Sequence, residues 1–222
     1  MEFSGNINFY PMPNLTRLTE HTVILADGKF PENPQVINVL KSAKTVVCCD
    51  GATNKLVDFG MEPQYIAGDM DSISPELKQR FAARLYHSSD QETNDLTKAV
   101  ELCAEKGLNS IYIIGATGLR EDHMLANISL LADYAEKVKV DMLTDYGLFT
   151  PTLSTADFES KKGQQVSIFS LTPDIPLALH GLRYPVVNRP FTSWWQGTLN
   201  ESLAATFRVE FKHGKFIIFR QY

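Results

Sequence analysis

The sequence predicts a two-domain protein of the α/β plus all-β class, with an N-terminal Rossmann-like parallel sheet domain and a C-terminal antiparallel β-sandwich domain. From about residue 21 to residue 145, short apolar stretches alternate strictly with helical patterns, which is typical of parallel strands joined by helical crossovers. After Asp145 the helical periodicity ends, and short alternating stretches separated by turn residues indicate antiparallel strands. We expect the two domains to comprise residues 1–147 and 148–222.

The first domain is expected to alternate strands and helices throughout its length. The strands cover residues 22–26, 45–49, 65–67, 85–88, 110–114 and 138–143. The helices cover residues 34–42, 52–59, 75–84, 94–106 and 121–136. In the last helix, apolar residues recur three or four positions apart, which predicts a single apolar face. These residues are Met124, Leu125, Ile128, Leu131 and Tyr134.

The second domain is expected to contain only short strands. They lie within residues 148–154, 164–172, 177–186, 203–211 and 216–222. The last two flank the four residues Lys212 to Lys215, in which Gly214 supplies the positive φ that tight turns need. The sequence therefore predicts a hairpin between them.

The composition argues against several classes of protein. A formal net charge of −5 over 222 residues disfavours a nucleic-acid binder, which needs a basic stripe. No apolar run approaches the roughly 20 residues of a membrane span, and residues 1–20 lack the pattern of a signal peptide. Cys48, Cys49 and Cys103 are too few for a disulfide framework and are expected to be buried thiols. We therefore expect a cytoplasmic protein without nucleic-acid or membrane partners.

Acidic residues follow successive strands of the predicted parallel sheet. They are Asp50, Asp69, Asp71, Asp90, Asp95 and Asp122. Each has an ordinary structural explanation, as a turn residue, a solvated acid or a charge that complements a helix dipole. Together, however, they gather at the carboxyl edge of the sheet, where open α/β sheets bind ligands. Like charges at one edge repel each other unless a cation lies among them.

Magnesium is the cation that this pattern favours, because it prefers carboxylate oxygens, water and substrate phosphates as ligands. The sequence contains no CxxC or HExxH zinc pattern, no Walker P-loop and no GxGxxG dinucleotide fingerprint. A triphosphate would therefore be held by metal, by carboxylates and by backbone N–H groups of turns such as Gly115-Ala116-Thr117-Gly118. Lys98 and Arg120 are nearby cations, for which a solvated surface role is the alternative.

Six segments, taken in order, resemble blocks of the thiamine pyrophosphokinase family. They are residues 50–56, 68–72, 90–98, 118–123, 181–185 and 197–201. The resemblance runs from about residue 22 to the end of the sequence and covers both predicted domains. The chain departs from the family pattern at Ala52, where a glycine is usual, at Asn94, where a threonine is usual, and at Leu199, where a serine is usual.

The resemblance implies an ATP-binding catalytic domain over residues 1–147 and a thiamine-binding domain over residues 148–222. It implies a Mg²⁺-dependent homodimer with ATP as co-substrate, thiamine bound at the dimer interface, and thiamine diphosphate and AMP as products. In such a reaction an alcohol attacks the β-phosphorus of ATP as AMP departs, and the protein mainly positions the reactants and stabilises charge. The proton acceptor is a site carboxylate or a metal-bound water, and the sequence leaves that choice open.

The resemblance, carried onto matching positions, assigns roles to particular residues, and the charge of Lys98, the place of His123 at a helix start and the aromatic ring of Trp195 add these three. The catalytic and metal-binding residues are Asp69, Asp71 and Asp95. The ATP-binding residues are Asp50, Gly51, Asn54, Lys98, Arg120, Asp122 and His123. The thiamine-binding residues are Gln91, Thr198, Asn200 and Trp195. Helix capping is the alternative for His123. Packing within the sandwich or at the dimer interface is the alternative for Trp194 and Trp195.

Two other functions fit the same acidic edge. One is a related Mg²⁺-dependent pyrophosphokinase acting on another heterocyclic alcohol, such as a pterin, which would bind ATP but not thiamine. The other is a non-catalytic nucleotide or thiamine sensor, against which the full set of acidic positions argues, because a sensor does not need a complete metal site.

Overall fold

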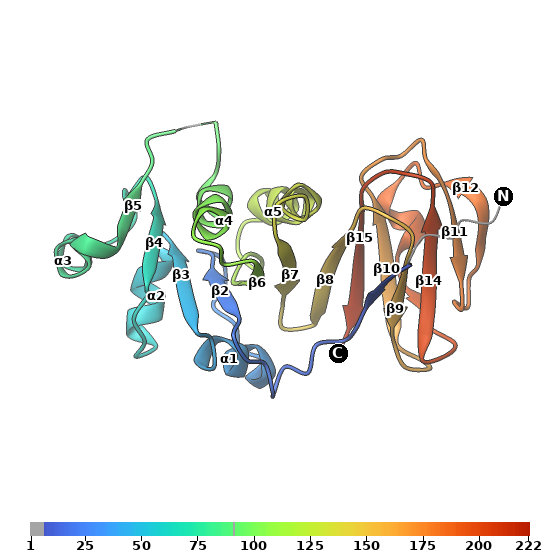
Figure 1. Ribbon diagram of the computed structural model, residues 1–222, viewed down its shortest axis with the longest axis horizontal. Helices are drawn as coiled ribbons and strands as arrows, with labels where there is room; N and C mark the ends of the chain where they lie inside the picture. The colour runs from blue at the N-terminus through green and yellow to red at the C-terminus, as the bar shows by residue number, and fades with distance from the viewer. Residues whose placement is uncertain (1–6, 91) are drawn as a thin grey trace. The chain divides into compact units, whose positions relative to one another are not determined.

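The computed structural model describes residues 7–90 and 92–222, and these form two compact units (Figure 1). One unit is continuous in sequence and spans Asn14–Asp145. The other combines Tyr146–Tyr222 with the N-terminal segment that ends at Pro13. The sequence predicts a boundary after residue 147, and the structure divides the chain after Asp145. In addition, the structure assigns the N-terminal segment to the second unit, which the sequence pattern does not indicate.

The unit Asn14–Asp145 contains a parallel sheet of six strands. These are β2 (Thr22–Leu25), β3 (Thr45–Cys49), β4 (Tyr65–Gly68), β5 (Leu85–His87), β6 (Ser110–Ile114) and β7 (Lys139–Leu143). Their order across the sheet is β7-β6-β2-β3-β4-β5, and every neighbouring pair is parallel. The order reverses direction between β2 and β6, which makes their carboxyl ends the topological switch point of the sheet. The predicted α/β class is confirmed.

Five helices connect these strands. They are α1 (Pro34–Lys41), α2 (Ala52–Asp58), α3 (Pro75–Arg80), α4 (Asp95–Glu105) and α5 (Glu121–Tyr134). Figure 1 shows α1 and α2 on one side of the sheet and α4 and α5 on the other. The side chains of Asn33, Ser74 and Asn94 accept hydrogen bonds from backbone N–H groups of the first turns, which fixes where α1, α3 and α4 begin. After α3 the chain continues as a short 3₁₀ turn at Ala82–Arg84.

The predicted apolar face of α5 is only partly buried. Ile128, Leu131 and Tyr134 lie in the core, whereas Leu125, in the first turns, is 50% exposed. The three cysteines are buried and free, and burial raises the pKa of the Cys103 thiol to about 12. They are therefore core thiols, as the sequence indicates. Within residues 7–90 and 92–222, no helix has both the length and the apolar character needed to cross a membrane.

The second unit is a β-sandwich of two sheets. One sheet has the order β1-β9-β14-β11-β12, formed by β1 (Asn8–Tyr10), β9 (Ala156–Glu159), β14 (Thr206–Phe211), β11 (Pro176–His180) and β12 (Val186–Pro190). The other contains β13 (Asn200–Glu201), β10 (Gln165–Ser170), β15 (Phe216–Gln221) and β8 (Gly147–Thr152) in that order. Aromatic side chains fill the core, including Phe158, Phe191 and Phe207. The predicted sandwich is confirmed, and the N-terminal strand β1 adds a parallel edge to it.

The hairpin predicted around residues 212–215 is wrong. Strand β14 pairs with β9 and β11, whereas β15 pairs with β8 and β10 in the opposite sheet. The turn therefore carries the chain from one sheet to the other. Phe211 and Phe216, on either side of it, both point into the core, with ring centroids 4.3 Å apart. The same alternation of apolar residues and the same glycine suit either connection, so the local sequence does not distinguish them.

Candidate active site

Three carboxylates converge at the carboxyl edge of the parallel sheet. Asp50 follows β3, and Asp69 and Asp71 follow β4, the neighbouring strand. One carboxylate oxygen from each lies within 4.8 Å of the others. Two of the predicted catalytic acids, Asp69 and Asp71, are thus brought together, and their third partner in this group is Asp50. Three hard oxygen donors at this spacing fit a magnesium ion better than a softer metal.

Asp50 holds the loop that carries the other two acids. Its side chain is buried, and its two carboxylate oxygens accept the backbone N–H groups of Ser72 and Ile73, both at 3.0 Å. Burial raises the pKa of Asp50, while these two hydrogen bonds oppose that shift. The backbone of Asp50 has a φ of +33°, a region that aspartate tolerates better than most residues. This predicted ATP-binding residue therefore organises the acidic loop.

The loop Gly68 to Ser72 alternates between buried and exposed residues. Met70 is buried beside Ile73 in a small apolar cluster, with a φ of +66°, whereas Asp69 is half-buried and Asp71 is exposed. Burying Met70 turns both acids toward solvent. The N–H of Asp71 donates to Asp69 Oδ1 at 3.2 Å, and the hydroxyl of Ser72 donates to Asp71 Oδ1 at 2.6 Å. That hydroxyl contributes most to the lowered pKa of Asp71, which keeps this carboxylate ionised.

Asp95 lies beside this group at the start of α4. A Cβ atom on Gly68 would lie 2.9 Å from the Cβ of Asp50 and 3.1 Å from the carboxyl carbon of Asp95, so glycine allows both acids to approach the loop. Burial raises the pKa of Asp95, and the ammonium of Lys98 opposes the shift, with Nζ 3.4 Å from Asp95 Oδ1. Lys98 is itself buried and faces a carboxylate, where the sequence predicts a phosphate ligand.

Asn54 and Gly51 stabilise the structure at the same carboxyl edge of the sheet. The Asn54 amide donates to the carbonyl oxygens of Gly51 (3.1 Å) and Ser72 (3.0 Å), and it accepts the N–H of Ser74 at 3.2 Å. Asn54 therefore joins the start of α2 to the acidic loop. Gly51 precedes α2 directly, and a Cβ atom there would lie 2.5 Å from Asp27 Oδ2.

The remaining acidic and basic candidates are exposed. Arg120 pairs with Asp122 through two hydrogen bonds, Nε to Oδ1 at 3.1 Å and Nη2 to Oδ2 at 2.5 Å, which lower the pKa of Asp122 to about 2. The His123 backbone N–H also donates to Asp122, and its side chain is exposed at the start of α5. Asp90 accepts hydrogen bonds from Thr93 and from a backbone N–H in its own loop. Gln91 lies outside the described residues.

The predicted thiamine residues of the sandwich belong to one local structure. Asn200 is buried, accepts the N–H groups of Tyr184 (3.1 Å) and Glu201 (2.9 Å), and donates to the carbonyl of Tyr184 at 2.8 Å. It therefore joins the two C-terminal segments that carry the family resemblance. Thr198 is exposed, and its hydroxyl donates to the Trp195 carbonyl at 2.8 Å. Trp195 is 74% exposed.

Trp194 differs from its neighbour. Its ring packs edge-on against Phe169, and its Nε1 donates to the carbonyl of Ser170 at 3.0 Å. Packing within the sandwich, the alternative considered for both tryptophans, therefore describes Trp194 only.

Sequence reasoning missed two residues at the carboxyl edge, Asp27 and Lys55. Asp27 follows β2 as the other acids follow their strands, and this position was the available signal. Lys55 lies on α2, and its ammonium is 2.7 Å from Asp27 Oδ1. A single lysine within a helix gives no such signal, because the contact joins residues that are far apart in sequence.

The parallel sheet, the carboxylates at its carboxyl edge and the β-sandwich define a two-unit protein whose acidic edge could hold a metal ion of the kind that phosphate-transferring enzymes use. Residues 36–142 match the family model of the thiamin pyrophosphokinase catalytic domain, and residues 147–219 match that of the thiamin pyrophosphokinase substrate-binding domain. The chain belongs to the thiamin pyrophosphokinase family.

Individual relatives agree with this assignment. Thiamine pyrophosphokinase of Bacillus subtilis (strain 168) is 32% identical over 149 residues, covering 63% of this chain and 69% of that protein. Thiamine pyrophosphokinase 1 of Oryza sativa subsp. japonica is 28% identical over 162 residues, covering 61% and 60%, so the match spans less than two thirds of the rice protein. The solved structure of thiamin pyrophosphokinase from Candida albicans has the same fold, with a TM-score of 0.79 at 21% identity over 97% of this chain and 93% of that one.

Proposed function

We propose that this protein is a thiamine diphosphokinase, which transfers the terminal pyrophosphoryl group of ATP to thiamine. The observation that carries the proposal is the group of three carboxylates, Asp50, Asp69 and Asp71, at the carboxyl edge of the catalytic-domain match. An acidic edge binds a triphosphate when a divalent cation lies between the two, and carboxylates are the protein ligands that Mg²⁺ prefers. Membership in the family supplies the acceptor, thiamine.

In the proposed reaction the thiamine hydroxyl oxygen forms a bond to the β-phosphorus of ATP. The bond between that phosphorus and the oxygen bridging to the α-phosphorus breaks, AMP leaves, and the hydroxyl proton passes to a base at the same edge. Asp69 and Asp71, with Asp95 beside them, would hold magnesium, which neutralises phosphate charge when bound. Asp50 keeps the loop of Asp69 and Asp71 in place through Ser72 and Ile73.

The other assignments belong to the same proposal. The exposed pair of Arg120 and Asp122, with His123, lies at the start of α5 and is available to a nucleotide. Gln91, Thr198, Asn200 and Trp195 remain the proposed thiamine residues, Asn200 by holding the segment of Tyr184 rather than through a free amide. We propose a cytoplasmic homodimer, with catalytic residues 1–147 and thiamine-binding residues 148–222, in which the exposed Trp195 suits contact with a flat cationic ring.

The first test is an assay of AMP release with ATP and Mg²⁺, with and without thiamine, in which the product is identified by mass. We expect thiamine-dependent AMP together with thiamine diphosphate. The Asp71→Asn variant should lose at least about 100-fold in kcat, because it removes a metal carboxylate. ATP binding without thiamine-dependent AMP would contradict the proposal, and a screen of other heterocyclic alcohols would then separate a different acceptor from a sensor.

A further inference from the structure

Lys55 contacts three oxygen atoms of one loop. Its Nζ lies 2.7 Å from Asp27 Oδ1, 2.9 Å from the carbonyl oxygen of Asp27 and 2.7 Å from the carbonyl oxygen of Gly28. A lysine ammonium has three N–H donors, and these three oxygens match that number. Two of the three contacts are to backbone, so Lys55 fixes the path of the chain after β2 and does more than pair with a charge.

The same loop is held on its other side by the turn that follows β6. The N–H of Gly28 donates to the carbonyl oxygen of Gly115 at 2.6 Å, and the N–H of Lys29 donates to that of Thr117 at 2.8 Å. A Cβ atom on Gly28 would lie 2.4 Å from the Gly115 oxygen, so this approach requires glycine. Because β2 and β6 flank the topological switch point, the two loops meet where α/β sheets bind ligands.

The start of α2 also connects this loop to the carboxylates. Gly51 directly precedes α2, the helix that carries Lys55. Because glycine has no side chain, this position leaves room for the Asp27 carboxylate and for Ser72. Ser72 belongs to the loop that Asp50 holds and that carries Asp71. Lys55 therefore holds a loop that bonds to the Gly115–Gly118 turn on one side and lies beside Gly51, next to Ser72 of the acidic loop, on the other.

We propose that Lys55 is a positioning residue for the nucleotide, which sets the Gly115–Gly118 turn at a fixed place relative to the carboxylates. It acts through the backbone of Asp27 and Gly28 and does not contact the phosphates, since its donors are used by the loop. The inference rests on the proposed ATP site. Its chemistry differs from that of Lys98, whose ammonium faces a site carboxylate directly.

The test compares Lys55→Met with Asp27→Asn and with a matched control, Lys137→Met. Lys55→Met orphans two backbone carbonyl groups, whereas Asp27→Asn keeps an oxygen for Lys55. Lys137→Met removes an exposed ion pair to Glu101. Binding of the magnesium complex of α,β-methylene-ATP, which cannot release AMP, is measured by calorimetry. Amide hydrogen exchange is followed in peptides covering residues 26–33 and 115–120.

For Lys55→Met we expect nucleotide binding to weaken at least about tenfold, with faster exchange in both peptides. Asp27→Asn should lose no more than about threefold, and Lys137→Met should match the wild type. In turnover assays, KM for ATP should rise while kcat at saturating ATP changes little, a split that a general loss of stability would not produce.

Results that contradict the role of Lys55 can be distinguished from results that contradict the proposed ATP site. A folded Lys55→Met variant that binds the analogue as tightly as the wild type overturns the inference alone. Faster exchange at residues 26–33 without any change at 115–120 also overturns it, because the link across the switch point would then be absent. A wild-type protein that does not bind the analogue at all overturns the proposed ATP site together with this inference.

Discussion

Two residues of the acidic edge, Asp50 and Met70, have positive φ angles although neither is glycine. Such conformations cost about 1–2 kcal/mol each and persist only when the surroundings impose them. At Asp50 the surroundings are two backbone N–H donors, and at Met70 they are the apolar cluster of Ile66, Ile73 and Phe81. The conformation that exposes the acids is thus stabilised by contacts that do not involve a ligand.

This arrangement predicts different effects for two similar substitutions. Asp50→Asn removes one carboxylate oxygen and leaves the N–H of Ser72 or Ile73 without an acceptor, which should lower the free energy of unfolding by about 1–3 kcal/mol. Asp69→Asn, at a half-buried position, should change it by less than about 0.5 kcal/mol. Urea unfolding followed by far-UV circular dichroism measures both. Equal stability of the two variants would contradict the anchoring role of Asp50.

The sequence predicted which acids gather at this edge, but it did not predict which of them is buried and anchors the loop. Asp50, Asp69, Asp71 and Asp95 each follow a strand or begin a helix, and a parallel sheet brings such positions to one edge. Which acid is buried depends on hydrogen bonds from a loop more than 20 residues away, as between Asp50 and Ser72. The contacts of Lys55 with Asp27 and Gly28 could not be predicted for the same reason. Local patterns carry no information about such contacts.

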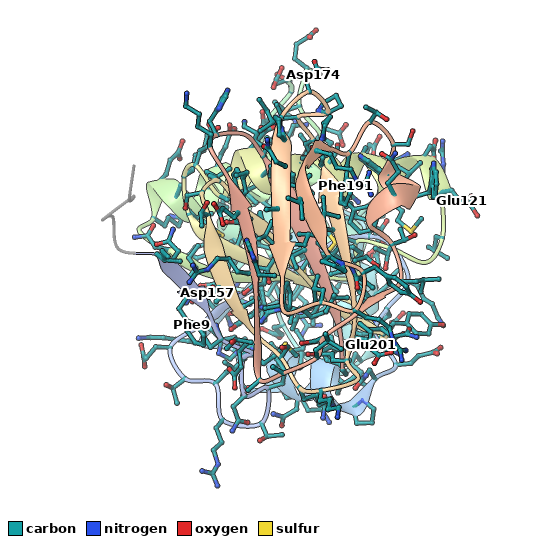
Figure 2. All side chains as sticks on the ribbon, turned by 90° about the vertical axis from the view of Figure 1, so that its right-hand side faces the viewer. Phe9, Glu121, Asp157, Asp174, Phe191 and Glu201 are labelled. Atoms are coloured by element: carbon teal, nitrogen blue, oxygen red, sulfur yellow. The ribbon has the colours of Figure 1, made fainter. Side chains whose placement is uncertain are left out.

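At the scale of elements, the ladder between β9 and β14 contains an opposite-charge pair. Asp157 and Arg208 face each other in register, with Nε to Oδ1 at 2.7 Å and Nη2 to Oδ2 at 2.9 Å. These hydrogen bonds lower the pKa of Asp157 below its ordinary value of 3.8. Phe9 and Asp157, opposite each other in the β1–β9 ladder, lie near one another in Figure 2.

A lowered folded-state pKa fixes the sign of the pH dependence. The pair stabilises the fold fully above the unfolded-state pKa near 3.8 and loses its effect as pH falls through the lower folded-state value. Arg208→Met should therefore cost about 0.5–1 kcal/mol near pH 7 and less near pH 2. Unfolding in urea at both pH values measures the difference, with Lys212→Met, an exposed charge removal, as the control. A cost that does not change with pH would mean that packing, and not the ion pair, accounts for it.

Element boundaries in the α/β unit were predictable because caps and periodicity are local. The predicted helix starts at residues 34, 75 and 94 lie within one residue of the observed starts of α1, α3 and α4, which the side chains of Asn33, Ser74 and Asn94 cap. The strand partners in the sandwich were not predictable. Strands β14 and β15 have the alternating pattern and the turn of a hairpin, yet they pair in different sheets. The choice depends on the aromatic core around Phe211 and Phe216, which many distant strands build together.

At the scale of the whole molecule, the sandwich unit is assembled from both ends of the sequence. Arg220, near the C-terminus, is buried, and it donates to the carbonyl oxygens of Tyr10 (2.9 Å), Pro11 (3.3 Å) and Glu159 (3.0 Å). Its guanidinium also lies over the ring of Phe158. The N-terminal segment is therefore part of the sandwich, although no periodic pattern in residues 7–13 predicts a strand there.

Two adjacent aromatic residues of β1 test that conclusion. The Tyr10 ring stacks on Phe158 with centroids 5.0 Å apart and packs against the sandwich core, whereas Phe9 is 55% exposed. Tyr10→Ala should lower the free energy of unfolding of the sandwich by about 2 kcal/mol, from lost burial and ring stacking. Phe9→Ala should lower it by less than about 0.5 kcal/mol.

The measurement can be confined to this unit, because both tryptophans of the chain, Trp194 and Trp195, belong to it. Tryptophan fluorescence during urea unfolding therefore follows the sandwich, while far-UV circular dichroism also follows the helices of the other unit. If Tyr10→Ala shifts the fluorescence transition and Phe9→Ala does not, β1 is an integral strand whose inward face carries its stabilising contacts. If neither variant shifts the fluorescence transition, the Tyr10 ring does not help to hold the N-terminal strand. The backbone ladder with β9 and the carbonyl contacts to Arg220, which both variants keep, would then hold it.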